Sequence, residues 1–396
     1  MKNVFVAIFA TVALLCLNFE AKSQVVESVS SKWFENIRLG GYTQLRYNRL
    51  FETNEDLTCE QCDKSLGKGK GFFLRRARIR LAGNLSKRVY AYLQFDMATA
   101  FSNSIQHGLG LKDAYFDLAL NDERSHRIRF GQSKIPYGFE NMQSSSNRLA
   151  LDRNDAINSA AKDERDLGAF YYYTPVGIRK RLSFLTRSGL KGSGDYGMFG
   201  FGLYNGQGAG RIEQNDNLHV IARFTYPFLV GEKQIIEAGI QGYKGKYSVS
   251  LSEVNENREN LFADERVAAS LTVYPQPFGF QGEYNIGKGP EYNALTNRTE
   301  EQSLTGGYAQ LMYRYAGDKH TFIPFLKYQY YDGGKKFELD ARSYLVRQTE
   351  IGVEWQWDKF ELVGLYSFED RNYVDGLKPV NHQVGSRFRL QAQFNY

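Results

Sequence analysis

The sequence predicts an all-β fold: a transmembrane antiparallel β-barrel of about 16 strands, with long extracellular loops and short periplasmic turns. Three observations predict it. Nearly every segment after residue 37 alternates polar and apolar residues with period two, and the connections alternate between short and long. Aromatic residues make up 15% of the chain, yet the mean hydropathy is -0.48. Abundant aromatics exclude a disordered chain, and the absence of apolar runs beyond the first twenty residues excludes a helical membrane protein.

The N-terminus is predicted to be a signal peptide that occupies residues 1–23. A positive charge at Lys2 precedes an apolar stretch over residues 4–19, and small residues follow it, which is the pattern of an exported chain. A membrane-anchoring helix is the alternative, but a span needs roughly 20 apolar residues. We expect residues 24–36 to form a short periplasmic segment and residues 37–396 to form the barrel.

The period-two alternation is clear in residues 89–96, where one apolar face alternates with a polar or aromatic face. The apolar face carries Val89, Ala91, Leu93 and Phe95, and the other carries Tyr90, Tyr92, Gln94 and Asp96. The last strand also alternates, and it ends on an apolar face at Tyr396. A final aromatic on that face resembles the C-terminal signal read by the barrel-assembly machinery, which is therefore an expected partner.

The connections between predicted strands set the strand count. Eight long polar ones are expected, over residues 49–71, 101–110, 139–164, 208–217, 252–263, 288–302, 333–342 and 372–380. Eight hairpins that open to one side imply about 16 strands, an even number as in single-chain bacterial barrels. Residues 176–196 do not fit this scheme, because Arg179-Lys180-Arg181 precedes a further short apolar piece. A strand extension, an extra hairpin and a periplasmic excursion remain open for this segment.

Two cysteines follow the predicted signal peptide, Cys59 and Cys62. In an exported protein we expect them to form a small disulfide at a loop tip. Half of a zinc site or a redox pair is the alternative. No second Cys or His pair lies nearby in the sequence to complete a metal shell.

Arginine spacing predicts a charged lumen. Arg76, Arg78 and Arg80 alternate with apolar residues, so three guanidinium groups stack on one face at intervals of roughly 7 Å. An arginine at mid-depth on the lipid face would cost ~2 to 4 kcal/mol, so these side chains are expected to point inward. The same argument gives the predicted lumen-lining, anion-binding set: Arg46, Arg76, Arg78, Arg80, Arg127, Arg129, Arg223, Arg387 and Arg389. The alternative is that these arginines only neutralise inward acids, namely Asp96, Asp113, Asp117, Glu350 and Glu354.

The sequence lacks the His-Glu-x-x-His, Gly-x-Ser-x-Gly and phosphate-cradling Gly-rich motifs, and its formal net charge is only +6. We therefore expect no enzymatic activity, no cofactor, no metal site and no nucleic-acid partner.

Four motifs occur in an order that resembles a known family. They are Phe72-Phe73-Leu74-Arg75-Arg76-Ala77-Arg78 with Gly83, Gly131-Gln132-Ser133-Lys134-Ile135-Pro136-Tyr137-Gly138, Asp166-Leu167-Gly168 and Tyr204-Asn205-Gly206. Together they resemble the phosphate-selective porin O and P family, especially its Bacteroidetes-type members. The resemblance implies a trimeric outer-membrane porin with an arginine ladder in its lumen and a third loop that folds inward at the constriction.

The third loop, residues 139–164, could from its sequence alone be a solvated outside loop, and it is the resemblance that implies an inward fold. The constriction candidates are Lys134, Arg148, Arg153 and Lys162. The loop contains a single lysine, so no lysine cluster marks a central phosphate site. Anion preference is therefore the broader expectation and phosphate selectivity the narrower one.

The function expected from these observations is passive diffusion of small hydrophilic solutes, with a preference for anions such as phosphate, across a bacterial outer membrane. The expected partners are outer-membrane lipid and two further copies of the chain in a homotrimer. The alternative is a surface-exposed barrel whose lumen is closed by loops and which acts as an adhesin or structural protein.

Overall fold

The computed structural model describes residues 32–50, 71–98, 107–255 and 259–396. The predicted signal peptide and the predicted disulfide between Cys59 and Cys62 lie outside these residues. A short 3₁₀ helix, η1 (Trp33–Asn36), precedes the first strand.

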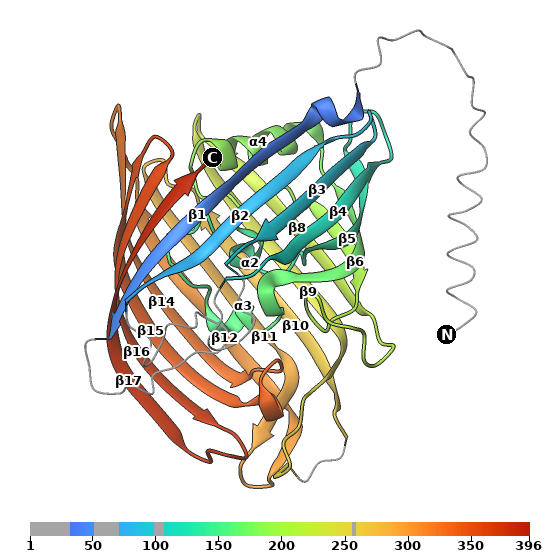
Figure 1. The fold of residues 1–396 in the computed structure, drawn as a ribbon, viewed down its shortest axis with the longest axis vertical. Coiled ribbons are helices and arrows are strands. Elements are labelled where there is room, and N and C mark those ends of the chain that lie inside the picture. The colour runs from blue at the N-terminus through green and yellow to red at the C-terminus, as the bar shows by residue number, and fades with distance from the viewer. Residues whose placement is uncertain (1–31, 51–70, 99–106, 256–258) are drawn as a thin grey trace, which may run out of the picture. The chain divides into compact units, whose positions relative to one another are not determined.

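The described part of the chain forms one antiparallel sheet that closes on itself (Figure 1). Its strands are β1 (Ile37–Leu50), β2 (Gly71–Asn84), β3 (Val89–Asp96), β4 (Gly110–Ala119), β5 (His126–Lys134), β6 (Arg165–Tyr173), β7 (Phe199–Tyr204), β8 (His219–Val230), β9 (Gln234–Ser248), β10 (Leu261–Val273), β11 (Phe278–Asn293), β12 (Arg298–Tyr313), β13 (Tyr315–Ala316), β14 (His320–Gly334), β15 (Ser343–Trp357), β16 (Phe360–Val374) and β17 (Asn381–Asn395). Strand β1 pairs with both β2 and β17, which closes the ring. The two-residue β13 continues β12 against β14, so the wall has sixteen strands. The predicted barrel is confirmed.

The helices are few and short: α2 (Phe139–Met142), α3 (Asp155–Asn158), α4 (Val176–Arg187), and the 3₁₀ helices η2 (Lys162–Glu164) and η3 (Leu339–Ala341). Within the described ranges, no helix combines the length and the apolar character needed to cross a bilayer.

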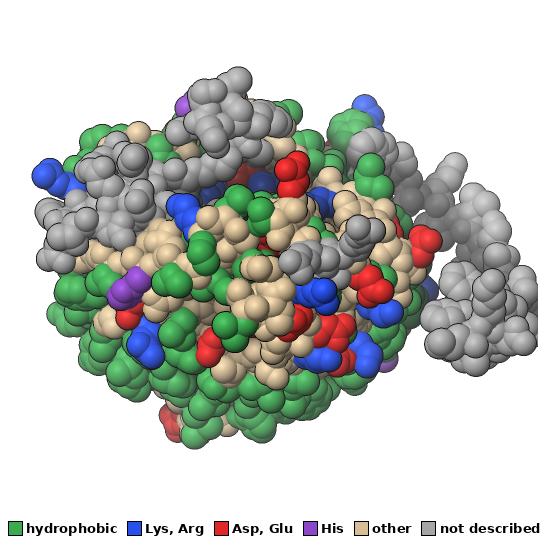
Figure 2. Space-filling view, turned by 90° about the horizontal axis from the view of Figure 1, so that it is seen from below, with side chains coloured by type: hydrophobic (Ala, Val, Ile, Leu, Met, Phe, Trp, Pro, Cys, Tyr) green, Lys and Arg blue, Asp and Glu red, His purple; other side chains and the backbone are tan. Residues whose placement is uncertain are grey.

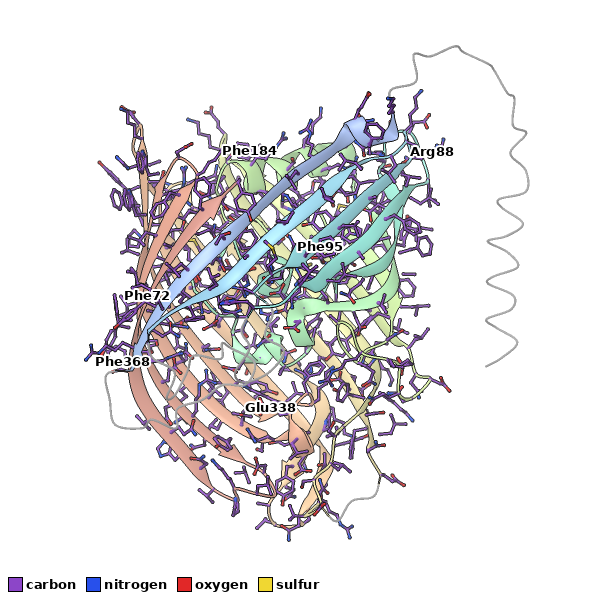
Figure 3. All side chains as sticks on the ribbon, in the orientation of Figure 1. Phe72, Arg88, Phe95, Phe184, Glu338 and Phe368 are labelled. Atoms are coloured by element: carbon purple, nitrogen blue, oxygen red, sulfur yellow. The ribbon has the colours of Figure 1, made fainter. Side chains whose placement is uncertain are left out.

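The barrel is inside-out relative to a soluble protein. On β1, Gln44 and Arg46 are fully buried on the inner face, whereas Leu39 is 71% and Leu45 is 42% exposed on the outer face. Phe72 and Phe368 likewise project from the outer surface (Figure 3). Seen from below, hydrophobic side chains line the left and lower edge of the molecule, and many charged ones lie on the end face inside that edge (Figure 2). An apolar outer face with a polar interior is the arrangement that a lipid-spanning barrel requires.

The two ends of the barrel differ in their connections. Most turns at one end are short, as between β8 and β9 or β15 and β16, and the chain ends there (Figure 1). Arg88 in the β2–β3 turn and Phe184 on α4 lie at this end, and Glu338 lies at the other (Figure 3). Short turns mark the periplasmic end of such barrels.

One predicted long loop is wrong. Residues 288–302 are mostly strand, because β11 continues to Asn293 and β12 begins at Arg298. Gly289 pairs with Gln302 and Glu291 with Glu300. Beyond the bilayer both faces of a strand meet water, so polar residues on both faces are compatible with continued pairing.

The segment that did not fit the strand pattern forms α4 at the short-turn end (Figure 1). Ile178, Leu182 and Leu185 are its buried side chains, at the spacing of one helix face. Of the three alternatives left open by the sequence, the periplasmic excursion is the one that the structure shows.

Candidate functional site: a cation cluster on an inward segment

The segment between β5 and β6 lies inside the barrel, and we call residues 135–161 the inward segment. Nearly all of residues 135–161 are buried, and α2 and α3 are seen within the ring of strands (Figure 1). Glu283 on β11 accepts a hydrogen bond from the backbone N–H of Glu140 at 3.0 Å. The side chain of Gln329 on β14 accepts one from the backbone N–H of Asp155 at 2.8 Å. The segment is thus bonded to strands far from its own in the sheet order.

Local hydrogen bonds hold the segment in this shape. The Asn154 side chain caps α3 by accepting a hydrogen bond from the backbone N–H of Ile157 at 3.0 Å. Glu140 in α2 accepts hydrogen bonds from both the backbone N–H and the side-chain amide of Asn154, each at 2.7 Å. The two short helices are therefore joined directly, and a buried carboxylate is satisfied at the junction.

Three carboxylates of the segment form ion pairs with the wall. Asp155 lies 2.6 Å from Lys335 and 3.1 Å from Arg371, and the other pairs are Asp152 with Arg46 and Arg389, and Glu140 with Lys327. Burial raises the pKa of Asp155, but the charges of Arg371 and Lys335 outweigh it and hold that pKa well below its usual range. These carboxylates therefore remain ionised in the folded barrel near neutral pH.

Glu164 stands at the centre of a group of cations. Its carboxylate lies 2.7 Å from Lys134, 2.8 Å from Arg153, 3.2 Å from Arg165 and 3.8 Å from Arg148. We call these five residues the Glu164 cluster. Only Arg165 has a second carboxylate partner among the described residues, Asp113 at 2.9 Å. The cluster therefore carries more positive than negative charge.

Two arginines of the Glu164 cluster keep hydrogen-bonding capacity. Nε and Nη1 of Arg148 are buried without a hydrogen-bond acceptor in the described part of the chain, and Nη1 of Arg153, although 2.8 Å from Glu164, is not aligned to form a hydrogen bond with it. Burial lowers the pKa of Arg153, and the charge of Arg148 lowers it further. Guanidinium donors of this kind can bind a carboxylate or phosphate with two parallel hydrogen bonds.

The constriction candidates from the sequence thus lie together with one exception. Lys134, Arg148 and Arg153 all contact Glu164, whereas the side chain of Lys162 lies outside what the structure describes. Lys134 also donates hydrogen bonds to the backbone carbonyls of Asn141 at 2.9 Å and Gln143 at 2.7 Å.

The predicted lumen arginines lie on the inner face. Arg46, Arg76, Arg78, Arg127, Arg129, Arg223, Arg387 and Arg389 are buried, and Arg80 is exposed. Most of them face carboxylates: Arg78 with Asp96 at 2.8 Å, Arg129 with Asp117 at 2.7 Å, Arg127 with Asp195 at 2.8 Å, Arg389 with Glu350 at 2.6 Å, and Arg387 with Glu369. The alternative that arginines neutralise inward acids therefore describes most of the wall.

Three of these arginines have no carboxylate partner among the described residues: Arg76, Arg223 and the exposed Arg80. Arg76 donates to the Gln44 side chain at 2.9 Å and has no carboxylate within ion-pair distance. Arg223 donates to the backbone carbonyls of Tyr196 at 3.0 Å and Gly197 at 2.8 Å, again without a carboxylate partner. Excess positive charge is thus local, near the Glu164 cluster and at Arg76 and Arg223, rather than spread along a ladder.

Sequence reasoning missed Arg75 and Arg165. A β-bulge shifts the register between Gln44, which pairs with Arg76, and Leu45, which pairs with Leu74. Arg75 is therefore the extra residue of β2, and the regular alternation is interrupted there. Burial raises the pKa of Asp152, but neighbouring arginines, Arg75 among them, lower it well below its usual range. Arg165 directly follows the predicted third loop, and only the fold shows that it joins Glu164 to Asp113.

Two of the sequence motifs meet in space. Asp166 accepts hydrogen bonds from the backbone N–H groups of Leu167 at 2.8 Å, Gly206 at 2.8 Å and Gly208 at 3.0 Å. One carboxylate thus organises the start of β6 and the turn after β7. Among the described residues, no group of three or more His, Cys, Asp or Glu side chains is arranged to hold a metal ion.

Comparisons with known proteins agree with this architecture. A model of the family described as phosphate-selective porin O and P matches residues 55–396. No curated protein matches the chain. The outer membrane channel DcaP of Acinetobacter baumannii is similar in structure at 13% identity, with a TM-score of 0.57, covering 91% of this chain and 97% of that chain.

Two further solved structures share the fold. The anion-selective porin from Comamonas acidovorans is 12% identical, with a TM-score of 0.52, and the match covers 91% of this chain and 99% of that chain. OmpT of Vibrio cholerae is 9% identical, with a TM-score of 0.53, and the match covers 94% of this chain and 100% of that chain. At these identities the likeness concerns the fold alone.

Proposed function

The chain belongs to the phosphate-selective porin O and P family, whose members are outer-membrane channels, and from this premise we propose that it lets small hydrophilic anions diffuse passively across the outer membrane. The Glu164 cluster is the observation that carries this proposal. Four cations share one carboxylate there, and only Arg165 has a second carboxylate partner among the described residues.

The physical argument concerns the local field. A water-filled path between low-dielectric walls focuses the field of uncompensated charges and concentrates ions of opposite sign. Arginine remains charged at any physiological pH and can hold a phosphate or carboxylate with two parallel hydrogen bonds. The anion selectivity of the Comamonas acidovorans porin, which shares the fold, is consistent with this proposal.

Phosphate is the narrower form of the proposal. The segment offers guanidinium groups rather than a lysine cluster, so phosphate would be recognised by forked donors such as Arg148 and Arg153. We therefore place weak phosphate binding, rather than strict phosphate selectivity, at the Glu164 cluster.

The test is a reversal potential. The purified barrel, inserted into a planar bilayer under a potassium chloride gradient, is expected to show anion preference. Cation preference would refute the proposal. Adding inorganic phosphate tests the narrower form, because binding at the Glu164 cluster reduces chloride current, and an unchanged current removes phosphate from the proposal.

One observation favours a second candidate, a surface-exposed barrel with a closed lumen that serves as an adhesin or structural protein. The inward segment is bonded to strands β1, β11, β14 and β16, so the interior is crowded. Conductance across a planar bilayer distinguishes the two candidate functions, because a barrel with a closed lumen passes no current, whereas a porin does.

The proposal includes partners. Exposed apolar side chains on the outer face support contact with outer-membrane lipid, and the aromatic Tyr396 supports recognition by the barrel-assembly machinery during insertion. A trimer form is known for OmpT of Vibrio cholerae, which supports a homotrimer here. Electrophoresis of unheated and boiled samples tests the assembly, since an intact trimer migrates well above the monomer.

A further inference from the structure

The connection between β6 and β7 is unlike its neighbours at the periplasmic end. It runs from residue 174 to residue 198, whereas the other connections there are short turns. Its helix α4 buries Leu182 and Leu185 in one cluster with Phe139 of the inward segment and with Ile235 and Tyr274 of the wall. The helix is thus packed against the inward segment as well as against the wall.

After α4 the chain crosses the periplasmic mouth. We call residues 188–198 the strap. Lys191 Nζ in the strap lies 2.5 Å from Glu354 Oε1 on β15, and both side chains are almost fully buried. Strand β15 lies on the opposite side of the ring from β6 and β7, between which the strap is inserted.

A second set of contacts joins the strap to the wall near β6 and β7. Asp195 lies 2.8 Å from Arg127 on β5 and accepts a hydrogen bond from the Thr174 hydroxyl at 2.8 Å. Arg223 on β8 donates to the carbonyls of Tyr196 and Gly197. The strap is therefore held at both sides of the barrel.

The strap also contacts the inward segment directly. The side-chain amide of Gln143 donates to the Lys191 carbonyl at 2.6 Å, and that of Asn147 donates to the Gly192 carbonyl at 2.7 Å. A solute that passes the Glu164 cluster therefore meets a second element before it reaches the periplasm.

We propose that the strap is a periplasmic lid that limits the size of the solutes the channel passes, and that the Lys191–Glu354 ion pair is its latch. The inference rests on the chain being a channel but not on its preference for anions. The latch is the only ion pair between the strap and the far wall in the described residues. Removing one partner leaves the other buried and unpaired, which favours release of the strap.

The experiment measures single-channel conductance and the swelling of liposomes in a neutral trisaccharide. The Glu354→Ala and Lys191→Ala variants are each expected to raise conductance about twofold and to admit the trisaccharide faster, because a released strap widens the mouth. The double exchange Lys191→Glu with Glu354→Lys restores a pair of opposite charges and is expected to return both readouts toward wild type.

Glu301→Ala is the matched control, because it removes a carboxylate from an exposed pair with Lys288 and leaves the mouth untouched. The heat-induced gel shift shows which variants fold, and having two single variants keeps the test usable if one does not. Conductance and swelling that match wild type in folded variants would overturn the lid alone. Absence of conductance in the wild type and in both variants would refute the proposal that the protein is a channel. A cation-preferring reversal potential would refute only the anion preference.

Discussion

Nη2 of Arg371 on β16 lies 3.1 Å from Oδ2 of Asp155 in the short helix α3, and both side chains are 1% exposed. Asp155 also pairs with Lys335, which follows β14 in the chain. A single carboxylate on the inward segment therefore pairs with two buried cations of the far wall, of which Arg371 also lies 3.3 Å from Glu369. The segment and the wall stabilise each other through charge, not only through packing.

Asp155→Ala is expected to lower the stability of the barrel. Breaking a buried pair by removing one partner costs about 3–5 kcal/mol, and here Lys335 is left without its carboxylate partner. The temperature at which the unheated gel band converts to the unfolded one should fall. Asp122→Ala is the control, since it breaks an exposed pair with Arg88 of a kind worth about 0–1 kcal/mol. Equal transition temperatures for the two variants would contradict the anchoring role.

Arg153→Gln and Arg148→Gln are expected to weaken anion preference. Each removes a positive charge from the Glu164 cluster, so the local concentration of anions falls, and we expect the anion-to-cation permeability ratio to drop roughly two- to fivefold. Reversal potentials measure the ratio. Lys244→Gln is the control, because Lys244 is 81% exposed and pairs with Glu265 away from the cluster. A similar drop in that control would show a net-charge effect instead.

Glu164→Gln is expected to raise the anion-to-cation permeability ratio, whereas the two arginine variants lower it. It leaves Lys134, Arg148 and Arg153 without their shared carboxylate, so the permeability ratio should rise, and phosphate should block chloride current at lower concentration. The change is also expected to reduce stability, since buried cations repel one another. A ratio that falls together with that of Arg153→Gln would place the cluster outside the ion path.

The pH dependence of the strap follows from Asp195. Burial raises its pKa, but the charge and hydrogen bond of Arg127 lower it to about 2. The pKa of Asp195 in the folded protein lies below its unfolded value of about 3.9. The stability that the Asp195–Arg127 pair contributes is therefore complete above a pH of about 3.9 and is lost as pH falls through the folded-state pKa. Conductance should therefore be constant from about pH 8 to about pH 5. A rise in conductance within that window would contradict the assignment.

Gly206→Ala is expected to reduce the yield of folded barrel. Its φ is +91°, and an added Cβ would lie 1.9 Å from the buried His219 ring. The backbone strain alone is of order 1–3 kcal/mol. Gly364→Ala is the control, since its added Cβ meets nothing within 4 Å. The fraction of protein showing the heat-induced gel shift reports the outcome, and wild-type yield for Gly206→Ala would refute the argument.

The wall of the barrel could be predicted because lipid outside and water inside impose alternation on every strand. Gln44 and Arg46 on one side of β1 and Leu39 on the other follow it directly. The rule gave no warning of the bulge that displaces Arg75, because a bulge changes the register without changing composition. It also ended β11 too early and began β12 too late, because polar strands outside the bilayer resemble loops.

The site was only partly predictable. Lys134, Arg148 and Arg153 were identified as charged residues near a long loop, but their common partner Glu164 depends on how that loop folds. The strap could not be foreseen, because Lys191 and Glu354 are far apart in sequence and neither belongs to a motif. Contacts across a lumen leave no periodic signal in the chain.

Asp152 has a bearing on how the cylinder is sealed. It pairs with Arg46 on β1 and with Arg389 on β17, the two strands that meet where the ring closes. Separating these strands sideways breaks at least one of these two ion pairs in addition to the backbone hydrogen bonds between the strands. Asp152 thus bridges the junction of the first and last strands, and lateral opening of the finished barrel requires it to give up its ion pair with one of them.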